Sequence, residues 1–376
     1  MANVAIVGAG FVADLYMRSL MTFPWITVVK AYDIDKRRLA TFCNYWKVAA
    51  AADLAELLDG PEPADLILNL TNPSAHFQVS KSCLEAGRHV YSEKPLATTM
   101  ANAIELHAAA RNKGLMLASA PCSVLGQAAQ TLWLALRRNE IGRPYLAYAE
   151  LDDDLISRAP YKSWFSESGA PWPYRDEFDS GCTVEHAGYY LTWLMAMFGA
   201  VKKVIAASAN MVGGGADSGA LAPDFSTATM FFEGGTVARL TCSIVAPHNH
   251  RMQIIGEHGL LEVADCWDNV SRVRIRRRYQ IRRRLINSPF TKQVRIFGTT
   301  HPKVSRRGAA SMNFALGPVE MLKAMNERRP CRLSADFALH LNEVTLAIQN
   351  ARDSAGVQVM RTSFPPMDPM PWAKGA

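Results

Sequence analysis

The sequence predicts an α/β protein whose N-terminal part is a doubly wound parallel sheet and whose C-terminal part is an α+β domain on an open, mostly antiparallel sheet. Strand-like and helix-like runs alternate through residue 120, which is the pattern of a parallel sheet. A Gly-x-Gly-x-x-Ala turn follows the first strand. Beyond residue 144, strand-like runs are separated by glycine turns. We therefore expect two domains, 1–122 and 123–376.

The glycine turn predicts a dinucleotide site. The apolar run 3–7 leads directly into it, and a second run, 27–32, ends in Asp33. Gly8 permits the tight turn, and Gly10 lets the backbone of the next helix approach a pyrophosphate. An acidic residue about 20 positions further on binds the ribose hydroxyls of NAD and repels a 2′-phosphate. The alternative is a glycine-rich turn in an ordinary α/β domain. The expected cofactor contacts here are Gly8, Gly10, Phe11, Val12, Ala13 and Asp33.

Two later strands deliver polar residues to the same edge of the sheet. Ligands of such sheets bind at the carboxyl ends of the strands. We therefore place Thr71, Asn72, His76, Glu93 and Lys94 on the cofactor side. The alternative for His76 is that it packs at a helix N-terminus and does not contact the cofactor. Lys94, half desolvated and beside a nicotinamide cation, is expected to have a pKa below its free value of about 10.4, which suits proton transfer.

These motifs together resemble a known family. The glycine turn is followed by Asn72-Pro73-Ser74-Ala75-His76, by Glu-Ala-Gly-Arg-His-Val at 85–90, by Glu93-Lys94-Pro95-Leu96-Ala97 and by Ile141-Gly142-Arg143-Pro144. Their order and spacing resemble the Gfo/Idh/MocA oxidoreductases over nearly the full length, most strongly over 3–150. The resemblance implies an N-terminal Rossmann domain that binds NAD, a C-terminal domain for substrate and oligomerisation, and a homodimer or homotetramer. It also implies that Lys94 works beside the nicotinamide ring.

The second domain departs from the family pattern Gly-Gly-x-x-x-Asp-x-x-x-His, whose Asp and His reach the substrate hydroxyl. Glu185 stands at the Asp position and Tyr189 at the His position. A spacing of four keeps Glu185, Tyr189 and Trp193 on one helical face. We expect Tyr189, near Lys94, to lose its proton more easily, with His186 as the second acid/base candidate. The alternative is that Tyr189 packs and His186 is a satisfied polar residue.

The segment before that helix is rich in recognition chemistry. Aromatic rings stack on sugars or bases, and basic groups bind phosphate. The alternative is a rigid proline-rich loop that packs its aromatic rings on the sheet. The expected substrate contacts are Lys162, Trp164, Trp172, Tyr174 and Arg175.

This loop and the substitutions at 185 and 189 look similar to relatives that act on nucleotide-linked sugars, particularly UDP-N-acetylglucosamine 3-dehydrogenases. The expected reaction oxidises a ring hydroxyl, at C3 of a UDP-linked N-acetylamino sugar, to a ketone. Hydride goes to NAD, and the proton goes to Lys94 with Tyr189 or His186. The alternatives are an oxidoreductase of a free sugar or polyol, a redox-neutral glycosidase, and a non-catalytic NAD-binding regulator.

Composition bounds the remaining possibilities. The chain has 376 residues, a net charge of +7, seven scattered cysteines without a Cys-x-x-Cys pair and no apolar run of membrane length. We expect it to carry no secretory signal segment. We expect a cytoplasmic protein that binds neither membrane nor nucleic acid. The run 272–284 holds eight arginines in thirteen residues, but its apolar residues alternate locally, which favours a hairpin with a solvated face over a nucleic-acid site.

Two further expectations concern the C-terminal half. The strand-like runs between 145 and 263 predict an antiparallel meander, and the amphipathic run 335–352 predicts a helix packed near the domain junction. His248 and His250 fall on one face of a strand without a third ligand in view, so we expect no metal.

Overall fold

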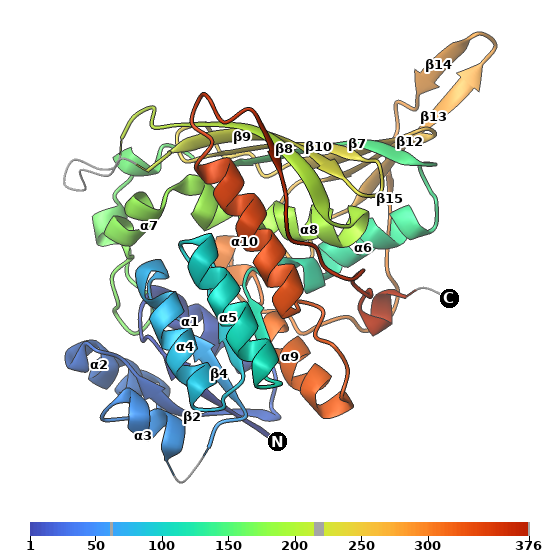
Figure 1. The fold of residues 1–376 in the computed structure, drawn as a ribbon. Coiled ribbons are helices and arrows are strands. Elements are labelled where there is room, and N and C mark those ends of the chain that lie inside the picture. The colour runs from blue at the N-terminus through green and yellow to red at the C-terminus, as the bar shows by residue number, and fades with distance from the viewer. Residues whose placement is uncertain (61–62, 214–221, 375–376) are drawn as a thin grey trace.

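The computed structural model describes residues 1–60, 63–213 and 222–374, and it contains two sheets with helices packed against them (Figure 1). The first sheet has six parallel strands in the order β3-β2-β1-β4-β5-β6. This confirms the predicted doubly wound sheet. Its elements are β1 (Ala2–Val7), α1 (Phe11–Leu20), β2 (Ile26–Tyr32), α2 (Lys36–Trp46), β3 (Ala49–Ala50), α3 (Leu54–Asp59), β4 (Leu66–Asn69), α4 (His76–Glu85), β5 (Val90–Ser92), α5 (Met100–Asn112) and β6 (Leu117–Ser119).

Side chains alternate between the two faces of this sheet because strand residues point to opposite sides in turn. Leu66 and Leu68 of β4 belong to one buried cluster together with residues of α1. Ile67 belongs to a second cluster together with residues of α4 and α5. Because both faces of β4 are covered, its first three residues are apolar, and its one polar residue, Asn69, stands at its carboxyl end.

The helices α9 (Leu316–Glu327) and α10 (Ala335–Gln349) return from the C-terminal half to the first sheet. Helix α9 packs against β4, β5 and β6, so this part of 123–376 covers the N-terminal sheet, which the sequence did not indicate. Helix α10 packs against both α5 and the second sheet, as expected for a helix near the junction (Figure 1). We retain 122/123 as a proposed boundary because it separates the last strand of the first sheet from the first strand of the second.

The second sheet has ten strands in the order β14-β13-β12-β11-β7-β10-β9-β8-β16, with β15 beside β13. It is mostly antiparallel, as predicted. The simple meander is wrong, however, because β7 lies between β11 and β10 and pairs with β10 in parallel. Its elements are α6 (Gln127–Arg137), β7 (Pro144–Asp152), α7 (Tyr174–Ser180), α8 (Gly188–Phe198), β8 (Val201–Ala209), β9 (Phe225–Phe232), β10 (Val237–Ser243), β11 (Met252–Gly256), β12 (Gly259–Val263), β13 (Arg274–Ile281), β14 (Arg284–Asn287), β15 (Lys292–Gln293) and β16 (Val357–Val359).

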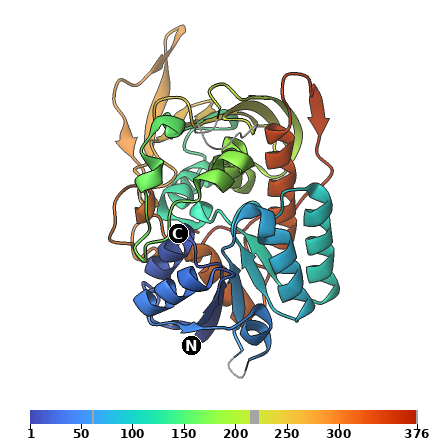
Figure 2. The same ribbon diagram turned by 90° about the vertical axis from the view of Figure 1, so that its left-hand side faces the viewer.

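The arginine-rich run forms the hairpin of β13 and β14, which extends away from the rest of the sheet in both views (Figures 1 and 2). Val273 and Ile275 are buried at its base, whereas the rest of the run is largely exposed. The alternation in the sequence therefore predicted this hairpin correctly.

Three further predictions from the sequence concern the cysteines, membrane-spanning helices, and the location and assembly of the protein. All seven cysteines are free and buried. No helix in the described part of the chain is long and apolar enough to cross a bilayer. The cytoplasmic location and the homodimer or homotetramer stay predictions.

Candidate active site

A cavity of about 920 Å³ lies between the two sheets and is lined from both sides. The N-terminal half supplies backbone and side chains at the ends of β1, β4 and β5, and the C-terminal half supplies the loop after β7, α7 and the start of α8. The expected site residues that line it are Gly10, Phe11, Val12, Thr71, Asn72, Glu93, Lys94, Trp164, Trp172, Tyr174, Arg175, Glu185, His186 and Tyr189. The structure thus brings residues far apart in sequence to one place.

The glycine turn forms a cradle at one end of the cavity. Gly8 has φ +99°, and a Cβ there would lie 2.6 Å from the backbone carbonyl of Leu70, so β1 and β4 meet too closely for a side chain. Gly10 caps α1 without a side-chain hydrogen bond, and a Cβ at Gly10 would meet nothing within 4 Å. Open space before uncapped helix amides fits a pyrophosphate. Ala13 is buried beneath this turn and does not line the cavity.

Asp33, at the end of β2, is held by the turn itself. Its Oδ2 accepts a hydrogen bond from Ala9 N at 2.8 Å, and its Oδ1 accepts one from Asp35 N at 2.8 Å. Asp33 is buried and does not line the cavity, whereas Arg38, whose Nε lies 3.7 Å from Asp33 Oδ2, does. The contact of Asp33 with a ribose stays a prediction.

His76 is fully buried and does not line the cavity. Its Nδ1 lies 2.7 Å from the carbonyl oxygen of Pro95, and its Nε2 lies 2.8 Å from that of Thr71. The imidazole therefore braces the two loops that carry Thr71 and Lys94. This is the packing interpretation of His76, and it places the residue behind the expected cofactor contacts.

Lys94 forms the charged centre of the site with two glutamates. Its Nζ contacts the carboxylate of Glu185, whose side chain is 5% exposed. Burial lowers the pKa of Lys94, but the negative charges of Glu185 and Glu177 outweigh burial and raise it above its ordinary value. The lowered pKa expected from the sequence is therefore wrong for this arrangement, because the sequence did not show that two carboxyl groups face the lysine.

The pKa values of the two carboxyl groups are shifted in opposite directions. Burial and the neighbouring charge of Glu185 raise the pKa of Glu177 well above its usual range. Burial also acts to raise the pKa of Glu185, but the contact with Lys94 outweighs it and holds that pKa below its usual value. Of the two carboxyl groups, Glu177 therefore keeps its proton to a higher pH than Glu185. Glu177 lies at the end of the segment 161–177, the recognition loop, and no separate role was predicted for it from the sequence.

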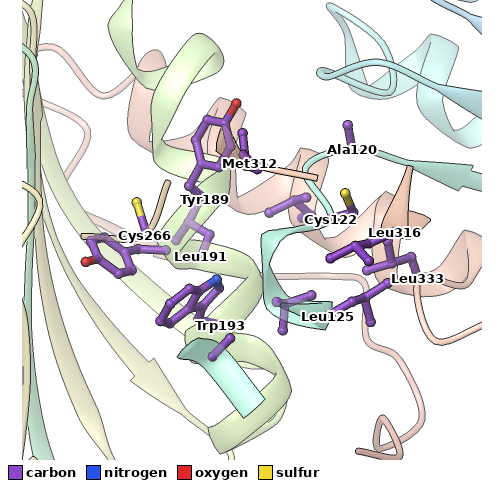
Figure 3. Close-up of a cluster of buried hydrophobic side chains, with 14 of the residues drawn as sticks. Ala120, Cys122, Leu125, Tyr189, Leu191, Trp193, Cys266, Met312, Leu316 and Leu333 are labelled. Atoms are coloured by element: carbon purple, nitrogen blue, oxygen red, sulfur yellow. The ribbon is translucent and has the colours of Figure 1, made fainter. Parts of the chain in front are cut away.

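A π-helical turn over Thr183–Ala187 places Glu185, and it separates α7 from α8. Gly181 begins it with φ +86°, where a Cβ would lie 2.3 Å from Gln349 Nε2. Glu185 in this turn and Tyr189 in α8 both line the cavity. Trp193, one turn further along α8, is not in the site: it is fully buried, and its Nε1 donates to Ser123 Oγ at 2.9 Å. Figure 3 shows Tyr189 and Trp193 at different levels of the same helix.

His186, Tyr189 and Trp267 form the wall opposite the glycine turn. The ring centroids of His186 and Tyr189 lie 5.8 and 5.7 Å from that of Trp267. Burial lowers the pKa of His186 to about 4, so its imidazole is neutral near pH 7. Burial raises the pKa of Tyr189 above its ordinary value despite the opposing charge of Lys94, which corrects the expected easy loss of its proton.

Two nitrogen atoms in this wall lack hydrogen bonds. His186 Nδ1 and Trp267 Nε1 are buried and find no partner within the part of the chain that the structure describes. Buried polar atoms are almost always paired in native proteins. These nitrogens therefore mark positions where a bound molecule can form hydrogen bonds.

The aromatic residues of the recognition loop pack on each other and also face the cavity. Trp164 and Trp172 have ring centroids 5.1 Å apart, and Tyr174 stacks with Tyr161 at 5.1 Å. The loop is thus a packed unit, with its rings on each other rather than on the sheet, and Trp164, Trp172 and Tyr174 also line the cavity. Their contact with a substrate stays a prediction. Lys162 lies on an exposed turn and does not line the cavity.

The same loop is fastened to α1 of the first domain. Ser168 N and Oγ donate to Asp14 Oδ2 at 2.8 and 2.9 Å in a buried position. Glu167 pairs with Arg18 on α1, and it also pairs with Arg306 at 3.2 Å. The loop therefore spans the cavity from the second domain to the first.

The raised pKa of Glu177 predicts that the stability of the folded protein depends on pH. Its raised pKa means that the folded protein binds a proton there that the unfolded chain releases, so the free energy of unfolding falls as pH rises above about 4.5. Glu177→Gln should flatten this fall from about pH 4.5 upward. Urea unfolding across that range checks it, with Asp179→Asn, an exposed carboxylate on the same helix, as the control. If the free energy of unfolding depends on pH in Glu177→Gln as it does in the unmodified chain, the raised pKa of Glu177 is refuted.

Comparisons with known proteins agree with this geometry. Residues 2–120 match the model of an oxidoreductase family with an NAD-binding Rossmann fold (GFO_IDH_MocA), and residues 129–262 match the GFO/IDH/MocA C-terminal domain. The trans-1,2-dihydrobenzene-1,2-diol dehydrogenase of Mus musculus is 26% identical over 267 residues, which cover 70% of this chain and 74% of that protein.

Two solved structures share the fold. UDP-N-acetylglucosamine 3-dehydrogenase GnnA from Acidithiobacillus ferrooxidans has a TM-score of 0.69 at 20% identity, covering 94% of this chain and 98% of that one. A levoglucosan dehydrogenase in complex with NADH and levoglucosan has a TM-score of 0.77 at 16% identity, covering 95% and 99%. With both family models matched in order along the sequence, the chain belongs to the Gfo/Idh/MocA family of NAD-binding oxidoreductases.

Proposed function

We propose that this oxidoreductase oxidises a sugar ring hydroxyl to a ketone, at C3 of a UDP-linked N-acetylamino sugar. The observation that carries the proposal is the contact of Lys94 with Glu185 in a cavity that also contains the glycine turn. NAD supplies the hydride acceptor, the nicotinamide ring, when it is bound. The residues at the cradle fit its pyrophosphate, as the uncapped α1 and the open space at Gly10 indicate.

The protonation states assign the roles of the side chains. Lys94, kept charged by Glu185, holds the substrate hydroxyl and stabilises the negative charge that develops on its oxygen. His186 lines the cavity and has a ring nitrogen without a partner, so it can accept a hydrogen bond from the substrate hydroxyl. Its pKa of about 4 makes it a weak base, so it accepts the hydroxyl proton only while Lys94 stabilises the oxygen that loses it. Tyr189 keeps its proton and serves as a hydrogen-bond donor. This moves the proton acceptor from Lys94, the sequence-based expectation, to His186.

The nucleotide-sugar class is supported by the recognition loop. Trp164, Trp172 and Tyr174 offer aromatic faces to the cavity, and Arg175 adds a cation that is suited to a phosphate group. One solved structure of the same fold, from Acidithiobacillus ferrooxidans, is named for a UDP-N-acetylglucosamine 3-dehydrogenase. Another, the WlbA dehydrogenase from Bordetella pertussis, is in complex with NADH and UDP-GlcNAcA. Lys162 stays a candidate phosphate contact at the exposed start of this loop.

A free sugar or small cyclic diol is the second candidate. The sequence relative named for trans-1,2-dihydrobenzene-1,2-diol covers 70% of this chain, and a structure of the same fold holds levoglucosan. These molecules carry a ring hydroxyl but no phosphate, so they would use the Lys94 end of the cavity without Arg175.

The test is NADH formation by the purified protein with NAD and a panel of UDP-N-acetylated sugars, free sugars and cyclic diols, followed by mass spectrometry. A product two hydrogen atoms lighter, formed from UDP-N-acetylated sugars alone, is the expected result. Turnover of the free sugars or diols alone would instead establish the second candidate. Tight NAD binding without NADH from any member would count against both, in favour of redox-neutral chemistry or a regulatory role.

A further inference from the structure

We propose that Asp153, His248 and His250 bind a divalent transition-metal ion at the wall of the substrate cavity. The ligand atoms of these three residues all lie within 4.8 Å of one another. In a tetrahedral zinc site with bonds of about 2.0 to 2.2 Å the ligand atoms lie about 3.3 to 3.6 Å apart, so the three side chains would close by up to about 1.5 Å around the ion.

The backbone register brings the three side chains together. Asp152, the last residue of β7, pairs with Asn249 in an antiparallel bridge, with N to O distances of 3.1 and 2.9 Å in the two directions. Residues on either side of a paired position point to the opposite face of the strand. His248 and His250 therefore share the face opposite Asn249, and Asp153, next to Asp152, joins them. This is the third ligand that the sequence alone did not reveal.

His250 is buried without a hydrogen-bond partner for its ring nitrogens in the described residues, whereas His248 already contacts Asp153, another of the proposed ligands. The side chain of His250 is 0% exposed, and neither of its ring nitrogens makes a hydrogen bond within the described part of the chain. Its Nδ1 lies 3.4 Å from Asp265 Oδ1, and His248 Nδ1 lies 3.4 Å from Asp153 Oδ1. The rings of His248 and His250 lie 4.1 Å apart, close to the edge of Trp267.

The donor set selects the kind of metal. Two imidazoles and one carboxylate suit Zn²⁺, Fe²⁺, Co²⁺ or Ni²⁺, whereas Mg²⁺ and Ca²⁺ prefer oxygen ligands throughout. Three protein ligands leave coordination positions for other molecules, as in catalytic zinc sites. Asp153 lines the same cavity as Lys94, so these positions are available to oxygen atoms of a bound substrate.

A second set shares His250 and is the structural rival. His250, Asp265 and Cys266 also have ligand atoms within 4.8 Å of one another. In that set Cys266 is fully buried, and Asp265 Oδ1 already accepts a hydrogen bond from Trp267 N at 2.7 Å. Only the set with Asp153 reaches the cavity, and it is the one we assign.

The test uses Co²⁺ as the probe and needs no substrate. The full chain is stripped with a chelator, desalted and titrated with Co²⁺, whose visible absorption reports nitrogen and oxygen ligation. One Co²⁺ per chain, displaced by Zn²⁺, is expected. His248→Ala, at a side chain 47% exposed, should lower the affinity about 100-fold, and Asp153→Asn should lower it as well. Circular dichroism confirms that the variants fold.

Two variants serve as controls. The exposed His258 lies outside the cluster, so His258→Ala should bind Co²⁺ like the unmodified chain. Cys266→Ser should also retain the site. The proposal is overturned if Co²⁺ does not bind saturably, if His248→Ala binds it unchanged, or if Cys266→Ser abolishes binding. Because the readout is metal binding, its failure leaves the proposed oxidation of sugars untouched.

Discussion

Lys94→Ala is expected to lower kcat by about 10²- to 10³-fold while NAD binding is retained, since one preorganised donor to a developing oxyanion is worth about that much. The ammonium of Lys94 contacts Glu185, and no other cation lines the cavity beside this carboxylate among the described residues. Steady-state kinetics with the substrate that the panel of sugars and diols identifies measures kcat, and titration with NAD measures cofactor binding separately.

Alanine at this position also leaves the buried Glu185 without its partner. Breaking a buried ion pair costs about 3 to 5 kcal/mol, and somewhat less here because the side chain of Lys94 is 18% exposed. Lys94→Arg is the matched control: it keeps a positive charge beside Glu185 and should restore stability, but its planar, bulkier group cannot occupy the same point, so kcat stays low. A Lys94→Ala enzyme with unmodified kcat would refute the role of Lys94.

Gly8→Ala should destabilise the protein by about 2 to 6 kcal/mol, because two costs combine there. Its backbone φ of +99° strains any residue with a Cβ, at about 1 to 3 kcal/mol. The new Cβ would also lie 2.6 Å from the carbonyl carbon and oxygen of Leu70, backbone atoms that cannot rotate away, and overpacking costs about 1 to 3 kcal/mol. Urea unfolding measures the loss.

Gly10→Ala is the matched substitution two residues away. Gly10 has φ −79°, which alanine adopts freely, and its Cβ would meet nothing within 4 Å, so stability should stay the same. The methyl group would, however, occupy the open space before α1, and NAD affinity should fall about tenfold or more. Equal destabilisation by both substitutions would show that the two glycines do not have these separate roles.

The sequence predicted the first sheet and its cofactor end well because their signals are local. The glycine turn, the apolar strands and the residues that follow them depend on backbone sterics and hydrophobic period, which short segments encode. Thus Gly10, Asn72 and Lys94 line the cavity as expected.

The electrostatics of the site could not be predicted in the same way. The direction in which the pKa of Lys94 shifts depends on two glutamates 83 and 91 positions away in the chain, at 177 and 185, and on how far each is buried. Tyr189 and Trp193 have the expected spacing within α8, but only Tyr189 lines the cavity, because the spacing does not show how far the cavity extends along the helix. Asp153 reaches the two histidines only through a bridge between strands that are distant in sequence.

The attachment of the recognition loop to α1 bears on the speed of turnover. Ser168 and Glu167 tie the loop to Asp14 and Arg18, on the very helix whose first residues face the cofactor cradle. A dinucleotide in the cradle would thus leave past a loop that must first release these contacts. We expect nucleotide departure, rather than hydride transfer, to limit the catalytic cycle. Pre-steady-state mixing of the protein with NAD and the sugar that it oxidises would then show a burst of reduced cofactor, and the absence of a burst would place the slow step at or before the chemistry.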